Sequence, residues 1–73
     1  MPRCTFPYNP KLQGMNILPT GVVEIDFKQK NKSIQTRVYH NMDQETAYKL
    51  FYSKDPLVYF TQNIKNQFIV TVK

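Results

Sequence analysis

The side chains with most chemical potential lie in one basic and aromatic stretch. From residue 28 to residue 37 the chain carries several cationic side chains and no acidic one, and Tyr39 follows two positions later. The basic residues of this stretch are Lys28, Lys30, Lys32 and Arg37. Phosphates attract cations, and every nucleobase has a face on which a ring can stack, so this pattern is typical of single-stranded nucleic-acid binding. A solvated hairpin loop would explain the lysines equally well, and both interpretations stay open.

Candidates for catalysis are few. Cys4 is the only cysteine and His40 the only histidine, so no set of four zinc ligands of these types exists. Cys4 lies among prolines, and we expect that stretch not to hold its sulfur within hydrogen-bond reach of His40. The chain has only two glycines, too few for a phosphate-binding glycine loop. We therefore expect no catalytic site, no cofactor and no metal ion.

The acidic residues have a structural explanation. Glu24 and Asp26 lie two positions apart on a predicted strand, where cross-strand pairing with Arg37 would account for them. No third oxygen ligand is nearby to complete a site for a divalent cation.

Size and composition bound the remaining possibilities. The chain has 73 residues, 41% of them apolar, which predicts one domain with a small interior. With one cysteine no internal disulfide can form, which indicates the reducing cytoplasm. No apolar run approaches the ~20 residues that span a bilayer. The net charge of +5 favours a polyanion or an acidic protein surface as partner, although it also serves solubility.

The elements that must position these residues begin with a hairpin. Residues 1–19 hold four of the five prolines and predict an irregular N-terminal arm, which could order on binding. Residues 20–28 and 34–40 alternate with a period of two and predict antiparallel strands joined by the polar loop 29–33. We expect Val23, Ile25 and Phe27 to face a helix. We expect Ile34, Thr36 and Val38 to lie on one face of the second strand, and Arg37 and Tyr39 to lie on the open face of the sheet beside Glu24 and Asp26.

A helix is predicted after the hairpin. Asp43 can cap it through its carboxylate, and Ala47, Leu50 and Phe51 lie on one helical stripe. Tyr48 and Tyr52 form an i, i+4 pair on its flank. The helix should end near Ser53–Lys54, because Asp55 precedes Pro56.

The last third of the chain completes the predicted domain, residues 20–73. Residues 57–60 fit either a strand or a second short helix, and residues 68–73 fit a strand. The fold class is α+β, with an antiparallel sheet of three to four strands and one main helix packed on one face.

The central stretch resembles the KTSC domain, a small module found at the end of some lysyl-tRNA synthetases and as stand-alone bacterial and phage proteins. The matching residues are Tyr39, Tyr48, Leu50, the pair Tyr59–Phe60, the pair Ile64–Lys65, and Phe68. The resemblance covers about residues 21–68 and implies an RNA-binding role. The chain departs from the pattern at Arg37, where a Tyr is usual, at Leu57, where a Gly is usual, and at Asp43, which replaces a proline.

The resemblance also separates structural rings from candidate contacts. It implies that Leu50, Phe51, Tyr59 and Phe60 form core, which leaves other tyrosines for a partner. The predicted partner-binding residues are Lys28, Lys30, Lys32, Arg37, Tyr39, Tyr48, Lys49 and Tyr52.

Two functions are expected from these observations. The first is a non-catalytic protein-binding regulator, similar in size and composition to small phage proteins that dock on host RNA polymerase and inhibit or modify it. The alternative is an RNA or single-stranded nucleic-acid binding module that uses a basic and aromatic sheet face. In both we expect a monomer when free and no membrane contact. A structural particle component also stays open.

Overall fold

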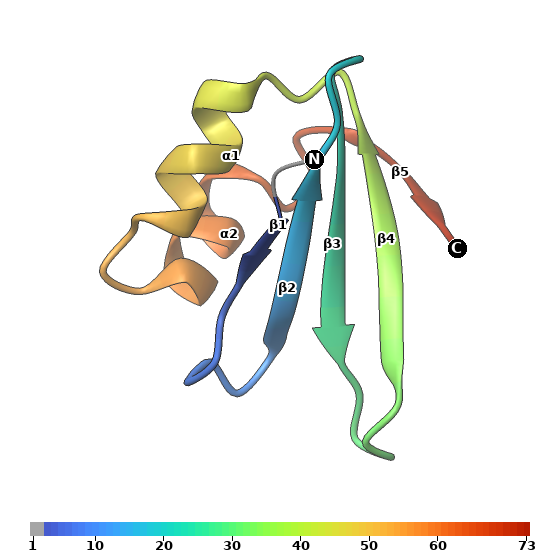
Figure 1. Cartoon of the computed structure of the whole chain (residues 1–73), viewed down its shortest axis with the longest axis vertical. Coiled ribbons are helices and arrows are strands. Elements are labelled where there is room, and N and C mark those ends of the chain that lie inside the picture. The colour runs from blue at the N-terminus through green and yellow to red at the C-terminus, as the bar shows by residue number, and fades with distance from the viewer. Residues whose placement is uncertain (1–2) are drawn as a thin grey trace.

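The computed structural model describes residues 3–73 as an antiparallel sheet of five strands with two helices (Figure 1). The strands are ordered in the sheet as they occur in the chain. The elements are β1 (Arg3–Thr5), β2 (Leu12–Ile17), β3 (Val22–Lys28), β4 (Ile34–His40), α1 (Gln44–Phe51), α2 (Pro56–Asn63) and β5 (Ile69–Val72). The α+β class is confirmed, but the described part has five strands, where three to four were expected, and two helices, where one was expected.

The N-terminal segment belongs to the sheet. The expectation of an irregular arm over residues 1–19 is wrong for residues 3–5 and 12–17, which form β1 and β2; residues 1 and 2 lie outside the described residues. Cys4 pairs with Met15, Met15 pairs with Ile25, and all three are buried. β1 and β2 therefore supply the edge and part of the core of this half of the sheet, although the prolines of this segment predict an irregular arm.

Two local features explain why these strands escaped prediction. Pro7 and Pro10 lie between β1 and β2, where proline removes no hydrogen bond of the ladder. A register shift between Leu12 and Gly14 interrupts the alternation of β2, because a bulge inserts one extra residue into a strand. The period-two pattern is therefore broken within the strand itself.

β3 and β4 form the predicted hairpin, but β4 turns its other face to the helices. Val23 lies opposite Tyr39, and Ile25 lies opposite Arg37; residues directly opposite each other share a face of the sheet. Tyr39 is only 2% exposed. The expectation that Arg37 and Tyr39 lie on the open face is therefore wrong.

The loop between the strands decides which face of β4 points inward. It closes with Lys28 opposite Ile34, and a slip of one residue would move every side chain of β4 to the other face. Such a slip would expose the ring of Tyr39, which packs edge-to-face against Phe60 with centroids 5.9 Å apart. A buried aromatic ring contributes more apolar area than the smaller side chain of Val38, so packing favours the observed register.

α1 follows the prediction closely. Ala47 and Leu50 are fully buried on the predicted stripe, and the helix ends at Phe51, two residues before the expected end. Asp43 precedes the first turn, but its carboxylate makes no capping bond to the backbone. Instead it accepts a hydrogen bond from the hydroxyl of Thr46. This bond lowers the pKa of the Asp43 carboxyl.

α2 contains residues 57–60, for which both a strand and a helix had been open. The carboxylate of Asp55 accepts a hydrogen bond from the backbone N–H of Val58 at 3.3 Å. Pro56 occupies the first helical position, where its missing N–H breaks no helical bond. Phe60 of α2 and Ile64, the residue just after the helix, are buried. Packing of these two side chains in the core holds α2 in place.

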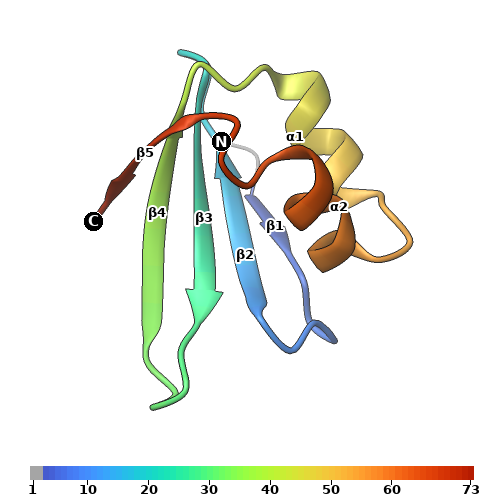
Figure 2. The ribbon, with the colours of Figure 1, turned by 180° about the vertical axis from the view of Figure 1, so that it is seen from behind.

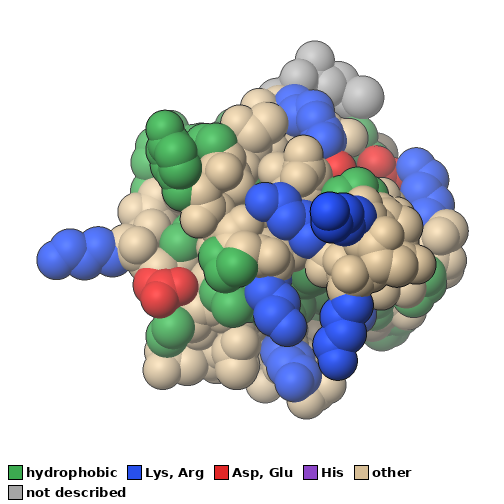
Figure 3. All heavy atoms as spheres, turned by 90° about the horizontal axis from the view of Figure 1, so that it is seen from below, with side chains coloured by type: hydrophobic (Ala, Val, Ile, Leu, Met, Phe, Trp, Pro, Cys, Tyr) green, Lys and Arg blue, Asp and Glu red, His purple; other side chains and the backbone are tan. Residues whose placement is uncertain are grey.

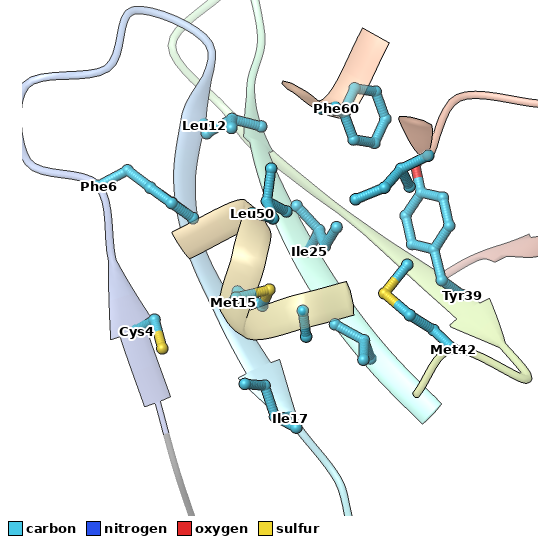
Figure 4. Packing of buried hydrophobic residues seen from close by; sticks show 13 residues of the cluster. Cys4, Phe6, Leu12, Met15, Ile17, Ile25, Tyr39, Met42, Leu50 and Phe60 are labelled. Carbon is cyan, nitrogen blue, oxygen red and sulfur yellow. The ribbon is translucent and has the colours of Figure 1, made fainter. Parts of the chain in front are cut away.

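The core lies between the two helices and one face of the sheet. Figures 1 and 2 show both helices on the β1–β2 side of the molecule, with β5 at the far edge. Figure 4 shows Tyr39 beside Met42, within the same cluster as Ile25 and Leu50. The buried residues are Cys4, Phe6, Leu12, Met15, Ile17, Val23, Ile25, Tyr39, Met42, Ala47, Leu50, Phe60 and Ile64. Neither helix of the described part has the length and apolar run that crossing a bilayer requires.

Candidate partner-binding surfaces

The open face of the sheet is occupied by its own ion pairs. Arg3 contacts the carboxylate of Asp26 at 2.8 Å, and Lys73 contacts that of Glu24 at 2.9 Å. Thr36 donates a further hydrogen bond to Asp26 at 2.7 Å. The expected pairing of these acids with Arg37 is wrong, because their partners are Arg3 of β1 and Lys73, the residue that follows β5. This face is therefore a charge-balanced surface and not a basic, aromatic platform.

Arg37 and Tyr39 lie on the helix side of the sheet. Burial prevents the ring of Tyr39 from stacking on a nucleobase and raises the pKa of its hydroxyl. The guanidinium of Arg37 lies 4.6 Å from the centroid of the Phe27 ring, a cation–π distance. Its Nε also donates to the side-chain oxygen of Gln35 at 3.0 Å. Tyr39 thus belongs to the core, and Arg37 covers the margin of that core.

The lysines of the hairpin lie at one end of the molecule. The ammonium of Lys28 donates to the backbone oxygen of Asn9 at 2.8 Å, and Lys30 and Lys32 are exposed in the loop. Lys11 joins them, because its backbone oxygen accepts the N–H of Lys28 at 2.8 Å. We call these four lysines the basic end.

The basic end is visible from below. Figure 3 shows Lys and Arg side chains across the middle of that view, with Asp and Glu only toward its margins. Sequence reasoning missed Lys11, which lies far from the hairpin in the chain and reaches it only through the pairing of β2 with β3.

The tyrosine pair at the C-terminal end of α1, formed by Tyr48 and by Tyr52 just after the helix, is exposed, as predicted. The rings of Tyr48 and Tyr52 stack with centroids 6.4 Å apart and planes inclined by 24°. Tyr52 is 76% exposed. The neighbouring Lys49 makes an i, i+4 ion pair with Glu45 at 3.3 Å. Its charge is therefore partly balanced within the helix, and the two rings dominate this face of α1.

An open cleft lies next to this pair. It has a volume of about 430 Å³ and lies between the β1–β2 loop and the connection from α1 to α2. Its lining residues are Thr5, Phe6, Pro7, Tyr8, Asn9, Pro10, Phe51, Lys54, Asp55 and Pro56. Phe51 joins the cleft to the tyrosine pair, because its ring packs edge-on against Tyr52 with centroids 5.0 Å apart.

Tyr8 stands at the cleft with 98% of its surface exposed. We call Tyr8, Tyr48, Phe51 and Tyr52 the aromatic surface. The sequence contained one sign of it, a tyrosine between two prolines. Its closeness to α1 could not be read from the chain, because Tyr8 and Phe51 are far apart in sequence.

Cys4 and His40 lie on opposite faces of the sheet. Cys4 is buried toward the helices, where desolvation raises the pKa of its thiol. His40 lies on the open face, with its Nε2 3.0 Å from the hydroxyl of Thr71. The two side chains are in separate strands, β1 and β4, and cannot form a nucleophile–base pair. Within residues 3–73, no three His, Cys, Asp or Glu side chains are grouped so as to hold a metal ion.

Comparison of the chain with models of known protein families finds no match, and comparison with curated proteins finds none either. The resemblance of residues 21–68 to the KTSC domain therefore stays a prediction.

Proposed function

We propose that the chain is a non-catalytic regulator that binds a partner protein through the aromatic surface. The observation that supports it best is the exposed, stacked pair of Tyr48 and Tyr52 beside the open cleft. Tyrosine is a favoured anchor at protein interfaces, because it is large, stiff and amphipathic. The rings are already ordered against one another, so little side-chain freedom would be lost on binding.

The size of the molecule is sufficient for such a contact. A specific interface buries about 800 Å² on each partner. The accessible surface of the chain is 4985 Å², so an ordinary interface would cover about one sixth of it. The aromatic surface can form the centre of that area, with polar residues such as Lys49 and Lys54 at its rim.

The charge of the chain indicates the kind of partner. With a net charge of +5, the domain is attracted to acidic protein surfaces. We propose bacterial RNA polymerase as the first partner to test, because small phage proteins of this size and composition dock on it. Binding would then inhibit or modify transcription by blocking a surface or clamping a mobile element.

A capture experiment tests the proposal. Tagged wild-type protein should retain RNA polymerase from bacterial lysate, and binding should be reproduced with the purified enzyme. The double variant Tyr48→Ser/Tyr52→Ser should weaken that binding about tenfold or more, because central aromatic anchors dominate interface energies. The matched control is Lys30→Gln/Lys32→Gln, which changes exposed loop residues and leaves the rings intact. Failure of the purified polymerase to bind would refute this choice of partner, and equal binding by the tyrosine variant would refute the aromatic surface.

Binding of RNA or single-stranded nucleic acid is the second candidate, favoured by the basic end. Four lysines gather there, and phosphate contacts release counterions. If this function holds, mixed-sequence RNA shifts in a gel at low salt, and Lys30→Gln lowers the salt dependence by about one counterion. The absence of a shift at low salt would remove this candidate.

A further inference from the structure

β5 forms a free, apolar edge of the sheet. Within the described part of the chain it pairs with β4 alone. Ile69 is 69% exposed and Val72 is 56% exposed. An exposed apolar edge strand presents unpaired backbone groups and serves as a template for another strand. The opposite edge, β1, has only three residues, so it offers a much shorter template.

The hydrogen bonds to β4 show which groups of β5 point outward. The N–H of Lys73 donates to the oxygen of Thr36 at 2.9 Å, and the register pairs Thr71 with Val38. In an antiparallel pair, hydrogen-bonded residues alternate with residues whose backbone groups point away. The N–H and C=O groups of Val70 and Val72 therefore point outward, toward any strand added to this edge.

A groove runs beside this edge on the helix side of the sheet. It has a volume of about 420 Å³, and the side chains of Val70 and Val72 lie in its wall. Its lining residues are Gln35, Arg37, Tyr39, Phe60, Lys65, Asn66, Val70 and Val72. Two of these side chains are cationic and none is acidic, so the groove favours negatively charged side chains.

We propose that β5 accepts an extended acidic segment of a partner protein as a sixth, antiparallel strand. This inference rests on the proposed protein-binding function and gives it a second contact, separate from the aromatic surface. Each of Val70 and Val72 would exchange two backbone hydrogen bonds with the residue opposite it. Those two partner residues lie two positions apart and share the face of the groove, so an Asp or Glu at each would lie on the side of Arg37 and Lys65.

Charge also decides against a second copy of this chain as the added strand. Two copies would each bring a net charge of +5 and would place Arg37 and Lys65 of both molecules along one edge. Like charges that meet at an interface oppose association. An acidic segment carries the complementary charge.

The test uses a nine-residue synthetic peptide with Glu at every second position and Thr between. Fluorescence anisotropy should detect binding of this peptide to the wild-type chain. In NMR spectra, the amide signals of Val70 and Val72 should shift when the peptide is added. The variant Val70→Pro removes one outward N–H without touching the ladder to β4, because proline is tolerated where the N–H of an edge strand faces solvent. Loss of one hydrogen bond should weaken binding about threefold to tenfold. The matched control Val70→Ala keeps the N–H and should bind more tightly than Val70→Pro.

Changes in the peptide test the same contact without altering the protein. Methylation of the Glu backbone nitrogens, which face β5, should abolish binding, whereas methylation of the Thr nitrogens should leave it. Replacing Glu by Lys should weaken binding at least tenfold, and Arg37→Gln/Lys65→Gln should flatten its salt dependence.

Three results would overturn the proposal. The first is equal binding by the two methylated peptides. The second is that the peptide shifts only amide signals of the basic end. The third is dimerisation of the chain through β5, detected by sedimentation. No binding of the acidic peptide, with RNA polymerase still captured through the tyrosines, would remove the β5 contact alone. Failure of the wild-type chain to capture RNA polymerase would instead refute that choice of partner and leave the peptide result to stand by itself.

Discussion

The register of the hairpin predicts very unequal losses of stability for two adjacent substitutions in β4. Tyr39 lies in the core and packs against Phe60, whereas Val38 lies on the open face opposite Glu24. Truncating a buried aromatic side chain to alanine costs about 3–5 kcal/mol, through lost burial and the cavity that remains. A half-buried valine on a sheet surface costs about 1 kcal/mol or less. Tyr39→Ala should therefore destabilise the domain several times more than Val38→Ala.

These costs are large relative to the whole stability. At about 0.05–0.15 kcal/mol per residue, a chain of 73 residues is stable by about 4–11 kcal/mol. Tyr39→Ala removes a large part of that, so Tyr39→Leu, which keeps part of the apolar volume, serves as the milder second variant.

Urea unfolding followed by circular dichroism measures both free energies of unfolding. The observed register predicts a much lower urea midpoint for the Tyr39 variants and a midpoint near wild type for Val38→Ala. If Val38→Ala were the more damaging change, β4 would have the opposite face toward the helices and the reasoning about the register would be refuted.

Three further predictions concern single contacts. The hydrogen bond from Thr46 lowers the pKa of the Asp43 carboxyl in the folded state. The ionised carboxylate therefore stabilises the fold at pH values above the unfolded pKa of about 3.8. This stability is lost as the pH falls through the lower, folded pKa. Thr46→Ala should flatten the change of the urea midpoint between about pH 5 and pH 2; an unchanged slope would contradict this. Arg3→Ala removes the ion pair that fastens β1, worth up to about 1 kcal/mol, and should speed alkylation of buried Cys4 by iodoacetamide about twofold to fivefold; an unchanged rate would show that the pair does not hold β1. Asp55→Ala should cost about 0.5–2 kcal/mol in urea unfolding, because α2 loses its cap; a loss near zero would contradict that role.

Elements with an uninterrupted pattern could be predicted from the sequence. The alternation in residues 20–28 and 34–40 corresponds to β3 and β4, although β3 begins only at Val22. The helical stripe through Ala47 and Leu50 corresponds to α1. α2 was undecided, because its short apolar run does not separate strand from helix. The Asp55–Pro56 pair, which predicts the end of α1, also marks the start of α2.

Features that depend on tertiary pairing could not be predicted. The bulge in β2 interrupts its alternation, and the inward face of β4 depends on how the loop closes onto Ile34. For the candidate site, the pair of Tyr48 and Tyr52 follows from helical spacing alone. The cleft beside it does not, because it forms only where the β1–β2 loop meets α1.

The most direct test of the proposed function is hydrogen exchange of the chain in complex with purified bacterial RNA polymerase. We predict slower exchange over residues 6–10 and 48–56, which carry the aromatic surface and its cleft. Slower exchange confined to the basic end, or exchange unchanged by the polymerase while RNA protects residues 28–33, would contradict it.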